Sequence, residues 1–388
     1  MQSDVRRNVR LLAWFNFLLD FRLYAPVMII YFERITGSYI SAMSILSAVM
    51  LSSSLLEVPT GIFSDLIGRR RTLILGAIAS LAAVVCYAIG ATYWVLLAGA
   101  VFEGLERALF SGNNDALLHD TLAELGEHGE YQVQLGRVSA AFQFALGISA
   151  IAGSMLAAFS FPVVMWLSVL PKCAMVAISF RFIEPRLGVE TAPNLLVHLR
   201  AALQHFATNP RLRLLTIAEV ISIGAGEAAF QFRTVFIEML WPLWAIGIAR
   251  AVGNGGAALS FFFAGNLIKR FGERRLLFGG MSLSEFMNLV ALFWSSVFSP
   301  IIMGATSIFY GVNAVSTNGM LQRHFSDAQR STMGSLTAFA GSISIALLSL
   351  VVGWLADQIG VRNALIITTI FGLQRLVFYH LALRDPAP

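Results

Sequence analysis

The turn around which this chain is organised reads Gly61-Ile62-Phe63-Ser64-Asp65-Leu66-Ile67-Gly68-Arg69-Arg70-Arg71. Apolar runs lie on both sides of it, at residues 41–63 and 72–91, and each is long enough to cross a hydrocarbon core of about 30 Å as a helix. The turn is therefore predicted to connect two membrane-spanning helices. Its three consecutive arginines indicate the cytoplasmic side, because positively charged loops resist translocation.

Two glycines, a carboxylate and two arginines give this turn its chemistry. Gly61 and Gly68 lack side chains, so two backbones can approach closely at these positions. Asp65, followed by Arg69 and Arg70, supplies charges that can bind the end of a neighbouring helix. We therefore expect these residues to form a contact that opens and closes on the cytoplasmic side.

The spacing of these residues, G-x-x-x-D-x-x-G-R-R, resembles the cytoplasmic signature between helices 2 and 3 of the major facilitator superfamily. The preceding Glu57-Val58-Pro59-Thr60 resembles a variant found in many bacterial efflux-like members. The family usually has a basic residue directly after the aspartate, whereas this chain has Leu66. The resemblance implies a secondary transporter whose two six-helix halves rock to give alternating access.

The composition identifies a membrane protein that crosses the bilayer several times. Hydrophobic residues make up 57% of the 388 positions and charged residues only 13%, whereas soluble proteins contain about 25% charged residues. The net charge of +5 comes from basic residues at the ends of apolar runs, so it does not indicate nucleic-acid binding. Cys86 and Cys173 lie inside apolar runs, and we expect neither a disulfide nor a metal site from them.

Apolar runs separated by polar breakers predict an all-α protein with twelve membrane-spanning helices. Only Arg34 and Arg362 fall in loops opposite the arginine-rich turn, so both termini are predicted to be cytoplasmic. We expect a monomer embedded in the lipid bilayer of the inner cell membrane. The predicted helices are residues 11–33, 41–63, 72–91, 94–117, 135–159, 161–183, 214–237, 242–266, 276–297, 299–321, 331–356 and 363–383.

An internal repeat divides the chain into two halves. The second copy, Gly265-Asn266-Leu267-Ile268-Lys269-Arg270-Phe271-Gly272-Glu273-Arg274-Arg275, matches the first turn in both glycines and the final two arginines, although Lys269 replaces the aspartate. Two halves in the same membrane orientation are the parallel-repeat arrangement of the superfamily. The predicted domains are an N-terminal six-helix bundle (1–183), a cytoplasmic linker (184–213) with a short amphipathic helix (195–207), and a C-terminal six-helix bundle (214–388).

Thirteen ionisable side chains fall within the predicted spans, where each costs several kcal/mol unless it is paired or hydrated. The resemblance implies that helices 1, 4, 7 and 10 line a central cavity, and most of these charges lie on the first three. The predicted proton-coupling and substrate residues are Asp20, Arg22, Glu103, Glu106, Arg107, Glu227, Arg233 and Asn313. The other ionisable residues within the spans are Glu57, Lys172, Glu219, Arg250, Glu285 and Arg375.

Carboxylates near the middle of the membrane are the candidates for proton exchange. Desolvation favours the protonated form of such a group and a nearby arginine favours the ionised form, so substrate arrival can switch its proton occupancy. We select Asp20 and Glu227 for this role. Glu103 and Arg107 are four residues apart in the order that favours a helical salt bridge, which can also be purely structural, and Glu106 is then left to face the cavity.

Some of the remaining charges are expected to be structural. Lys172, Glu285 and Arg375 lie on helices that form the outer scaffold in the family, where fixed ion pairs between helices are the simpler explanation. Glu219 and Arg233 lie nearer the helix ends, from which their side chains can extend toward the interface.

The sequence contains no motif for catalysis, nucleotide hydrolysis or metal binding. Its histidines show neither an H-E-x-x-H pattern nor a paired spacing. Lys172 and Lys269 are the only lysines, and neither follows a G-x-x-x-x-G loop that would bind ATP. We therefore predict a protein without enzymatic activity, cofactor or metal.

Three functions are compatible with these residues. The main hypothesis is proton-coupled export, by antiport, of a small organic molecule such as a drug or metabolite. The first alternative is proton-coupled uptake of a small organic anion or zwitterion bound by Arg22, Arg107 and Arg233. The second alternative, from another class, is a membrane sensor or scaffold that transports nothing.

Overall fold

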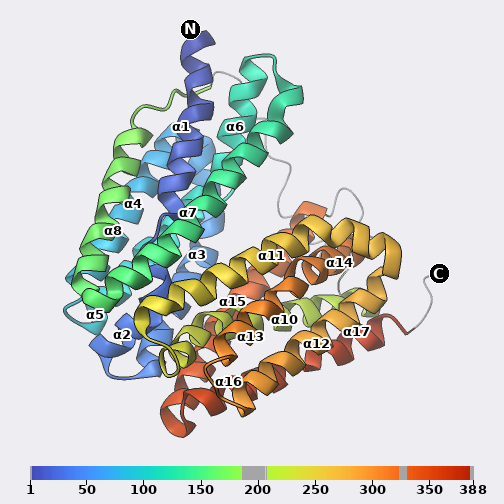
Figure 1. Ribbon diagram of the computed structural model, residues 1–388. Helices are drawn as coiled ribbons and strands as arrows, with labels where there is room; N and C mark the ends of the chain where they lie inside the picture. Colours follow the sequence, from blue (N-terminus) through green and yellow to red (C-terminus); the bar gives the residue numbers. More distant parts are fainter. Residues whose placement is uncertain (1, 186–205, 207, 323–329, 385–388) are drawn as a thin grey trace. The chain divides into compact units, whose positions relative to one another are not determined.

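Long helices built from the apolar runs make up this chain, as Figure 1 shows for the computed structural model. The structure describes residues 2–185, 206, 208–322 and 330–384, and this part of the chain contains no strand. In chain order, with η for 3-10 helices, the elements are α1 (Gln2–Asp20), η1 (Ala25–Val27), α2 (Met28–Thr36), α3 (Tyr39–Ile67), α4 (Arg69–Ile89), α5 (Tyr93–Phe110), α6 (Asn113–Glu124), η2 (His128–Glu130), α7 (Tyr131–Phe159), α8 (Phe161–Ser179), α10 (Pro210–Glu238), α11 (Leu243–Phe271), α12 (Glu273–Phe293), α13 (Ser299–Ala305), η3 (Thr306–Phe309), α14 (Tyr310–Gln322), α15 (Arg330–Ile359), α16 (Val361–Gly372) and α17 (Gln374–Ala382).

The observed helices agree with the predicted membrane spans. Nine helices among the described residues are long and apolar enough to cross a membrane. The further predicted spans correspond to α5 with α6, to α10, and to α13 with α14. The first span is interrupted at Phe21–Tyr24, where α1 ends before η1 and α2 continue it. The prediction of an all-α membrane fold is therefore confirmed.

Unit 1 is a compact group of helices that come mainly from the first half of the chain. Within it α4 packs against α5 and α8, while α1 packs against α7 and α8. The ring of Phe15 meets the rings of Phe110 and Phe182 edge to face, at centroid distances of 5.3 and 5.5 Å, in the centre of a buried apolar cluster. Unit 1 consists of Met1–Gly37, Ile45–Thr191 and Leu243–Gly247.

Unit 2 is built from the second half of the chain. In this unit α10 packs against α15, α16 and α17, and α12 packs against α14. Leu215, Leu277 and Tyr379 are fully buried in its apolar core. The predicted amphipathic helix at 195–207 lies outside the described residues apart from Phe206, and the predicted domain boundaries stay a prediction. Unit 2 consists of Ser38–Ser44, Ala192–Pro242 and Ile248–Pro388.

The turn between α3 and α4 is held by a carboxylate that follows α8. Gly68 has a φ of +92°, a backbone conformation that favours glycine. Glu184 accepts hydrogen bonds from the backbone N–H of Arg69 at 2.7 Å and of Arg70 at 2.8 Å. Its negative charge thus satisfies the amino end of α4. Asp65 instead forms an ion pair with the Arg69 guanidinium at 3.0 Å.

Two expectations about this turn are not met by the structure. A Cβ added to Gly61 would meet no atom within 4 Å among the described residues, because this position lies on the exposed side of α3. The carboxylate at the helix end is that of Glu184 rather than Asp65, because Asp65 is four residues before Arg69 and pairs with it. A gating role for the turn stays a prediction.

Two glycines of α7 have different surroundings. A Cβ added to Gly153 would overlap the backbone carbonyl of Leu23, in the interruption between α1 and η1. A Cβ added to Gly147 would meet no atom within 4 Å among the described residues. Gly153 therefore allows α7 to lie directly against the break in the first span, and Gly147 has no such role.

Gly153→Ala is expected to destabilise the protein by about 1–3 kcal/mol, because the added methyl group forces the Leu23 backbone to move. Thermal denaturation of the purified protein in detergent measures the change. The matched control is Gly147→Ala, which is expected to be neutral or to stabilise the helix by up to about 1 kcal/mol. Equal melting temperatures for the two variants would contradict the close packing at Gly153.

Candidate functional site

The interruption of the first span places two cationic side chains at the end of α1. The Leu19 carbonyl, in the last turn of α1, accepts hydrogen bonds from Arg22 Nε at 3.1 Å and from Lys172 Nζ at 2.6 Å. Positive charge at the carboxyl end of a helix is favourable, because the last carbonyl groups carry partial negative charge. Lys172, on α8, was expected to form a fixed ion pair between helices. Its ammonium group instead bonds the Leu19 carbonyl, because the interruption of the first span makes this carbonyl available as an acceptor.

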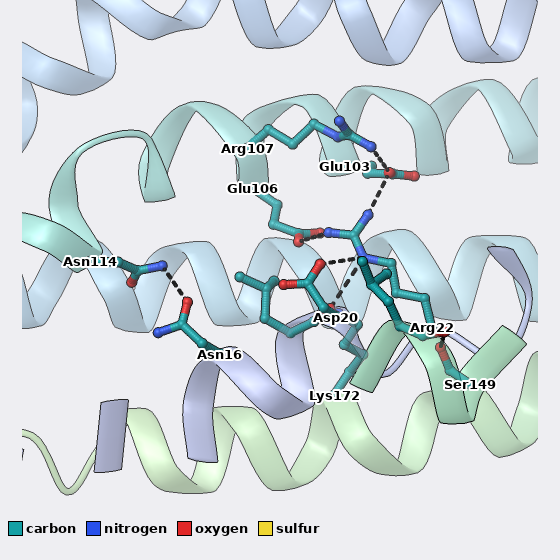
Figure 2. Close-up of polar contacts among 11 residues, drawn as sticks. Asn16, Asp20, Arg22, Glu103, Glu106, Arg107, Asn114, Ser149 and Lys172 are labelled. Atoms are coloured by element: carbon teal, nitrogen blue, oxygen red, sulfur yellow. Dashed lines mark hydrogen bonds and ion pairs between the residues drawn. The ribbon is translucent and has the colours of Figure 1, made fainter. Parts of the chain in front are cut away.

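Arg22 connects the first span to α5, as Figure 2 shows. Its Nη1 donates to Glu103 Oε1 at 3.0 Å, and its Nη2 donates to Glu106 Oε1 at 3.1 Å. The carboxylate of Asp20 lies farther away, with 3.8 Å between Oδ1 and Arg22 Nε. The structure thus brings three predicted carboxylates, Asp20, Glu103 and Glu106, around the guanidinium of Arg22.

Glu103 is the most heavily bonded carboxylate of this cluster. Besides Arg22, it accepts hydrogen bonds from Arg107 Nη2 at 2.9 Å and from the Tyr87 hydroxyl at 2.9 Å. The predicted helical salt bridge between Glu103 and Arg107 is confirmed. The prediction that Glu106 faces a cavity is wrong, since its side chain is only 2% exposed and is bonded to Arg22. Arg107 is the exposed member of the cluster, at 39%.

The charges of this cluster balance when every group is ionised. Asp20 is its least engaged carboxylate, because its nearest cationic atom is 3.8 Å away and its side chain is 16% exposed. A proton can therefore bind Asp20 without breaking a short hydrogen bond. The cations are Arg22, Arg107 and Lys172, and the anions are Asp20, Glu103 and Glu106.

A cavity of about 230 Å³ in unit 1 has Asn16, one helical turn before Asp20, in its lining. Asn114 Nδ2 donates to Asn16 Oδ1 at 3.1 Å, and Asn114 Oδ1 is buried without a hydrogen-bond partner among the described residues. Asn16 is four residues before Asp20, so both side chains lie on one face of α1. The cavity is lined by Asn16, Phe110, Gly112, Asn114, Asp115, Leu135, Val138, Ser139 and Phe142.

Sequence reasoning missed three polar members of this region. Tyr87, Asn16 and Asn114 are uncharged, so they lack the ionisation cost that marks a functional residue within an apolar run. The spacing of Asn16 and Asp20 is the signal that was present in the sequence, because a polar residue one turn before an intramembrane aspartate marks a polar helix face. Nothing in the sequence connects Tyr87 with Glu103.

Unit 2 contains a second set of intramembrane charges. Arg375 forms an ion pair with Glu285 and donates from Nη1 to Ser222 Oγ at 2.9 Å, so the predicted scaffold ion pair is confirmed. Glu219 accepts a hydrogen bond from the Tyr379 hydroxyl at 2.9 Å instead of extending to the interface. These groups hold α10, α12 and α17 together.

The remaining predicted site residues also lie in unit 2. Glu227 accepts a hydrogen bond from Gln231 Nε2 at 2.7 Å. Asn313 Oδ1 is buried and has no hydrogen-bond partner among the described residues. Arg233 lines a small cavity. Because Asp20 and Glu227 belong to different units, the chamber that they were expected to share stays a prediction.

Comparison with known proteins identifies the family of this chain. The profile of the Major Facilitator Superfamily matches residues 11–245 and 241–388. The chain belongs to the Major Facilitator Superfamily. Membership makes this MFS chain a multi-pass membrane transporter and not an enzyme, which confirms both predictions. No curated protein matches its sequence.

Solved structures with the same fold cover nearly the whole MFS chain. A mutant of the nucleoside transporter NupG has a TM-score of 0.83 at 11% identity, over 98% of this chain and 100% of that one. A bacterial homologue of the human lysosomal transporter Spinster has a TM-score of 0.77 at 15% identity, over 100% and 99%. A D-xylose–proton symporter has a TM-score of 0.71 at 14% identity, over 96% and 97%. At these identities the likeness shows the shared fold.

The two kinds of carboxylate in the cluster should respond differently to neutralisation. Glu103→Gln leaves the guanidinium groups of Arg22 and Arg107 without their shared carboxylate, and we expect a loss of about 3–5 kcal/mol of stability. Asp20→Asn removes only a contact of 3.8 Å and is expected to change stability little. Thermal denaturation in detergent compares the variants, and an Asp20→Asn variant as unstable as Glu103→Gln would contradict this division.

Proposed function

We propose that this chain is a proton-coupled secondary transporter of a small organic molecule and that Asp20 takes up and releases the proton. The observation that carries this proposal is the balanced set of six charges in which Asp20 alone has no short bond. Protonation of Asp20 changes the charge of the set from zero to positive. This change is costly in hydrocarbon, so it must be compensated by another charge or a change of conformation.

The position of Asp20 connects its charge with a place for substrate. Asn16 and Asp20 share one face of α1, and Asn16 lines the cavity of about 230 Å³. Asn114 also lines that cavity and donates to Asn16 Oδ1 from its Nδ2, so the cavity wall carries a pair of amide side chains. A molecule bound there would lie one helical turn from the proton site, so its affinity would depend on the proton occupancy of Asp20.

For the direction of transport we propose export, in exchange for protons. The support is the resemblance of Glu57-Val58-Pro59-Thr60 and of the turn after it to bacterial efflux-like members. In this proposal the turn residues Gly61, Asp65, Gly68, Arg69 and Arg70 close the cytoplasmic side of a monomer in the inner membrane, with both termini in the cytoplasm.

A second candidate function is proton-coupled uptake of an organic anion. It is favoured by Arg233, which has no carboxylate partner among the described residues of unit 2. Deletion of the gene separates the two directions. Loss of an exporter raises sensitivity to a toxic compound, whereas loss of an importer produces a growth requirement.

Asp20→Asn is expected to abolish substrate-driven proton movement and to retain substrate exchange, because the cavity is left intact. The protein is reconstituted in liposomes that contain a pH-sensitive dye, and a panel of nucleosides, sugars, dipeptides and organic acids is added. Counterflow of the active compound measures exchange. Glu130→Gln, which neutralises an exposed carboxylate in the same unit, is the matched control and should behave as wild type. Unchanged proton movement in Asp20→Asn would refute the assignment of Asp20.

A further inference from the structure

A small cavity in unit 2 is lined by two arginines. Arg233 lies on α10 and Arg250 on α11, near the ends at which these two helices are joined. The cavity has a volume of about 30 Å³, and most of its lining residues are buried, whereas Arg233 and Arg250 are partly exposed. Its lining residues are Phe230, Arg233, Thr234, Ile237, Ala249, Arg250, Gly253, Pro300, Met303, Gly304 and Ser307.

Neither arginine has a carboxylate partner in the described part of unit 2. Arg250 donates from Nη2 to Thr234 Oγ1 at 2.7 Å, and its guanidinium carbon lies 4.2 Å from the centre of the Phe230 ring. Both contacts leave its positive charge uncompensated. Arg233 forms no hydrogen bond or ion pair with any described residue.

The carboxylates that act on these arginines through space are already engaged. Glu227 attracts Arg250, and Glu285 attracts Arg233. Glu227 accepts its hydrogen bond from Gln231, however, and Glu285 is paired with Arg375. The two guanidinium groups at the cavity therefore differ from Arg22, Arg107 and Arg375, each of which contacts a carboxylate directly.

Two uncompensated cations within membrane-spanning helices are costly unless an anion joins them. Guanidinium groups bind planar carboxylates through paired, charge-assisted hydrogen bonds, which are about twice as strong as neutral ones. A volume of about 30 Å³ is room for about two water molecules, which is also the size of one carboxylate group. The apolar side chains of Ile237, Pro300 and Met303 exclude water and strengthen such a contact.

We propose that Arg233 and Arg250 bind the carboxylate group of the transported molecule, so that the substrate class is small organic acids. The inference rests on the proposed transport function, and it holds for either direction. It also assigns a role to Arg250, which the sequence pattern did not place in the site. Thr234 and Phe230 orient the Arg250 guanidinium from the side, and Arg233 is left with its donors free for the ligand.

Thermal denaturation in lipid-free detergent tests the site with paired probes. Acetate, benzoate and succinate are each compared with their amides, which keep the shape and lack the charge. At least one acid should raise the melting temperature of the wild-type protein with increasing concentration, because it binds only the folded state, and its amide should not. No shift with any of the acids, or an equal shift with the amides, would overturn the proposal.

Amino-acid substitutions test whether the rise in melting temperature comes from binding at this cavity. Arg233→Gln and Arg250→Gln should each weaken the affinity for the active acid at least about tenfold, because each removes charge-assisted hydrogen bonds. Arg213→Gln removes the same charge from the exposed start of α10 and should leave the shift unchanged. If a glutamine variant fails to fold, the affinity of the Gly253→Ala variant for the active acid tests the proposal instead. A Cβ there fits at 3.4 Å from Ser307 Oγ and reduces the cavity while both charges remain, so an unaltered affinity would overturn the proposal.

One further arm separates a substrate from a lipid headgroup, which offers the same oxyanion chemistry. Phosphatidylglycerol is added to the delipidated protein in place of the acids. A shift that depends on Arg233 and Arg250 with this lipid but with none of the acids would assign the cavity to the membrane and overturn the proposal. Because the assay uses no proton gradient, acid binding combined with absent transport would refute the proposed function and leave the anion site intact.

Discussion

The cost of an ionised side chain in hydrocarbon is the constraint on which this structure depends. In unit 1 an interruption of the first span satisfies this constraint. Where α1 ends, the carbonyl of Leu19 accepts hydrogen bonds, and the side chain of Arg22 can pair with carboxylates. Arg22 then joins that end to Glu103 and Glu106 of α5, and Lys172 joins it to α8. The charges that hold these helices together thus include Asp20, the carboxylate to which we assign the proton.

The sequence predicted those features that depend on local spacing or on length. Apolar runs gave the spans because a helix must match the thickness of the bilayer, and the four-residue spacing gave the salt bridge between Glu103 and Arg107. The break at Phe21–Tyr24 was missed although Pro26 follows it, a residue that cannot donate a backbone hydrogen bond to the carbonyl of Arg22 and so disfavours a continuous helix there. The bond between Arg22 and Glu103 was also missed, since residues that are 81 positions apart have no local pattern in common.

The errors over Glu106 and Lys172 have a common physical cause. In a soluble helix, hydrophobic periodicity shows which face is buried, but lipid is as apolar as the interior of a membrane protein. Large apolar side chains such as Phe159 and Phe262 are accordingly among the exposed residues. The apolar positions of a membrane-spanning helix therefore do not show which of its faces points to the protein interior. The direction of a single charged side chain cannot be predicted from them.

The contacts of Glu184 couple the end of α8 to the start of α4. Its carboxylate accepts hydrogen bonds from the backbone at the amino end of α4. Arg70 Nη2 also donates to the carbonyl of Phe180, just beyond α8, at 3.1 Å. The chain that leaves α8 is thus fastened to the arginine-rich turn by both a side chain and a backbone group. Displacement of the end of α8 is therefore expected to move the start of α4 with it, because a relative movement of the two would have to break these hydrogen bonds.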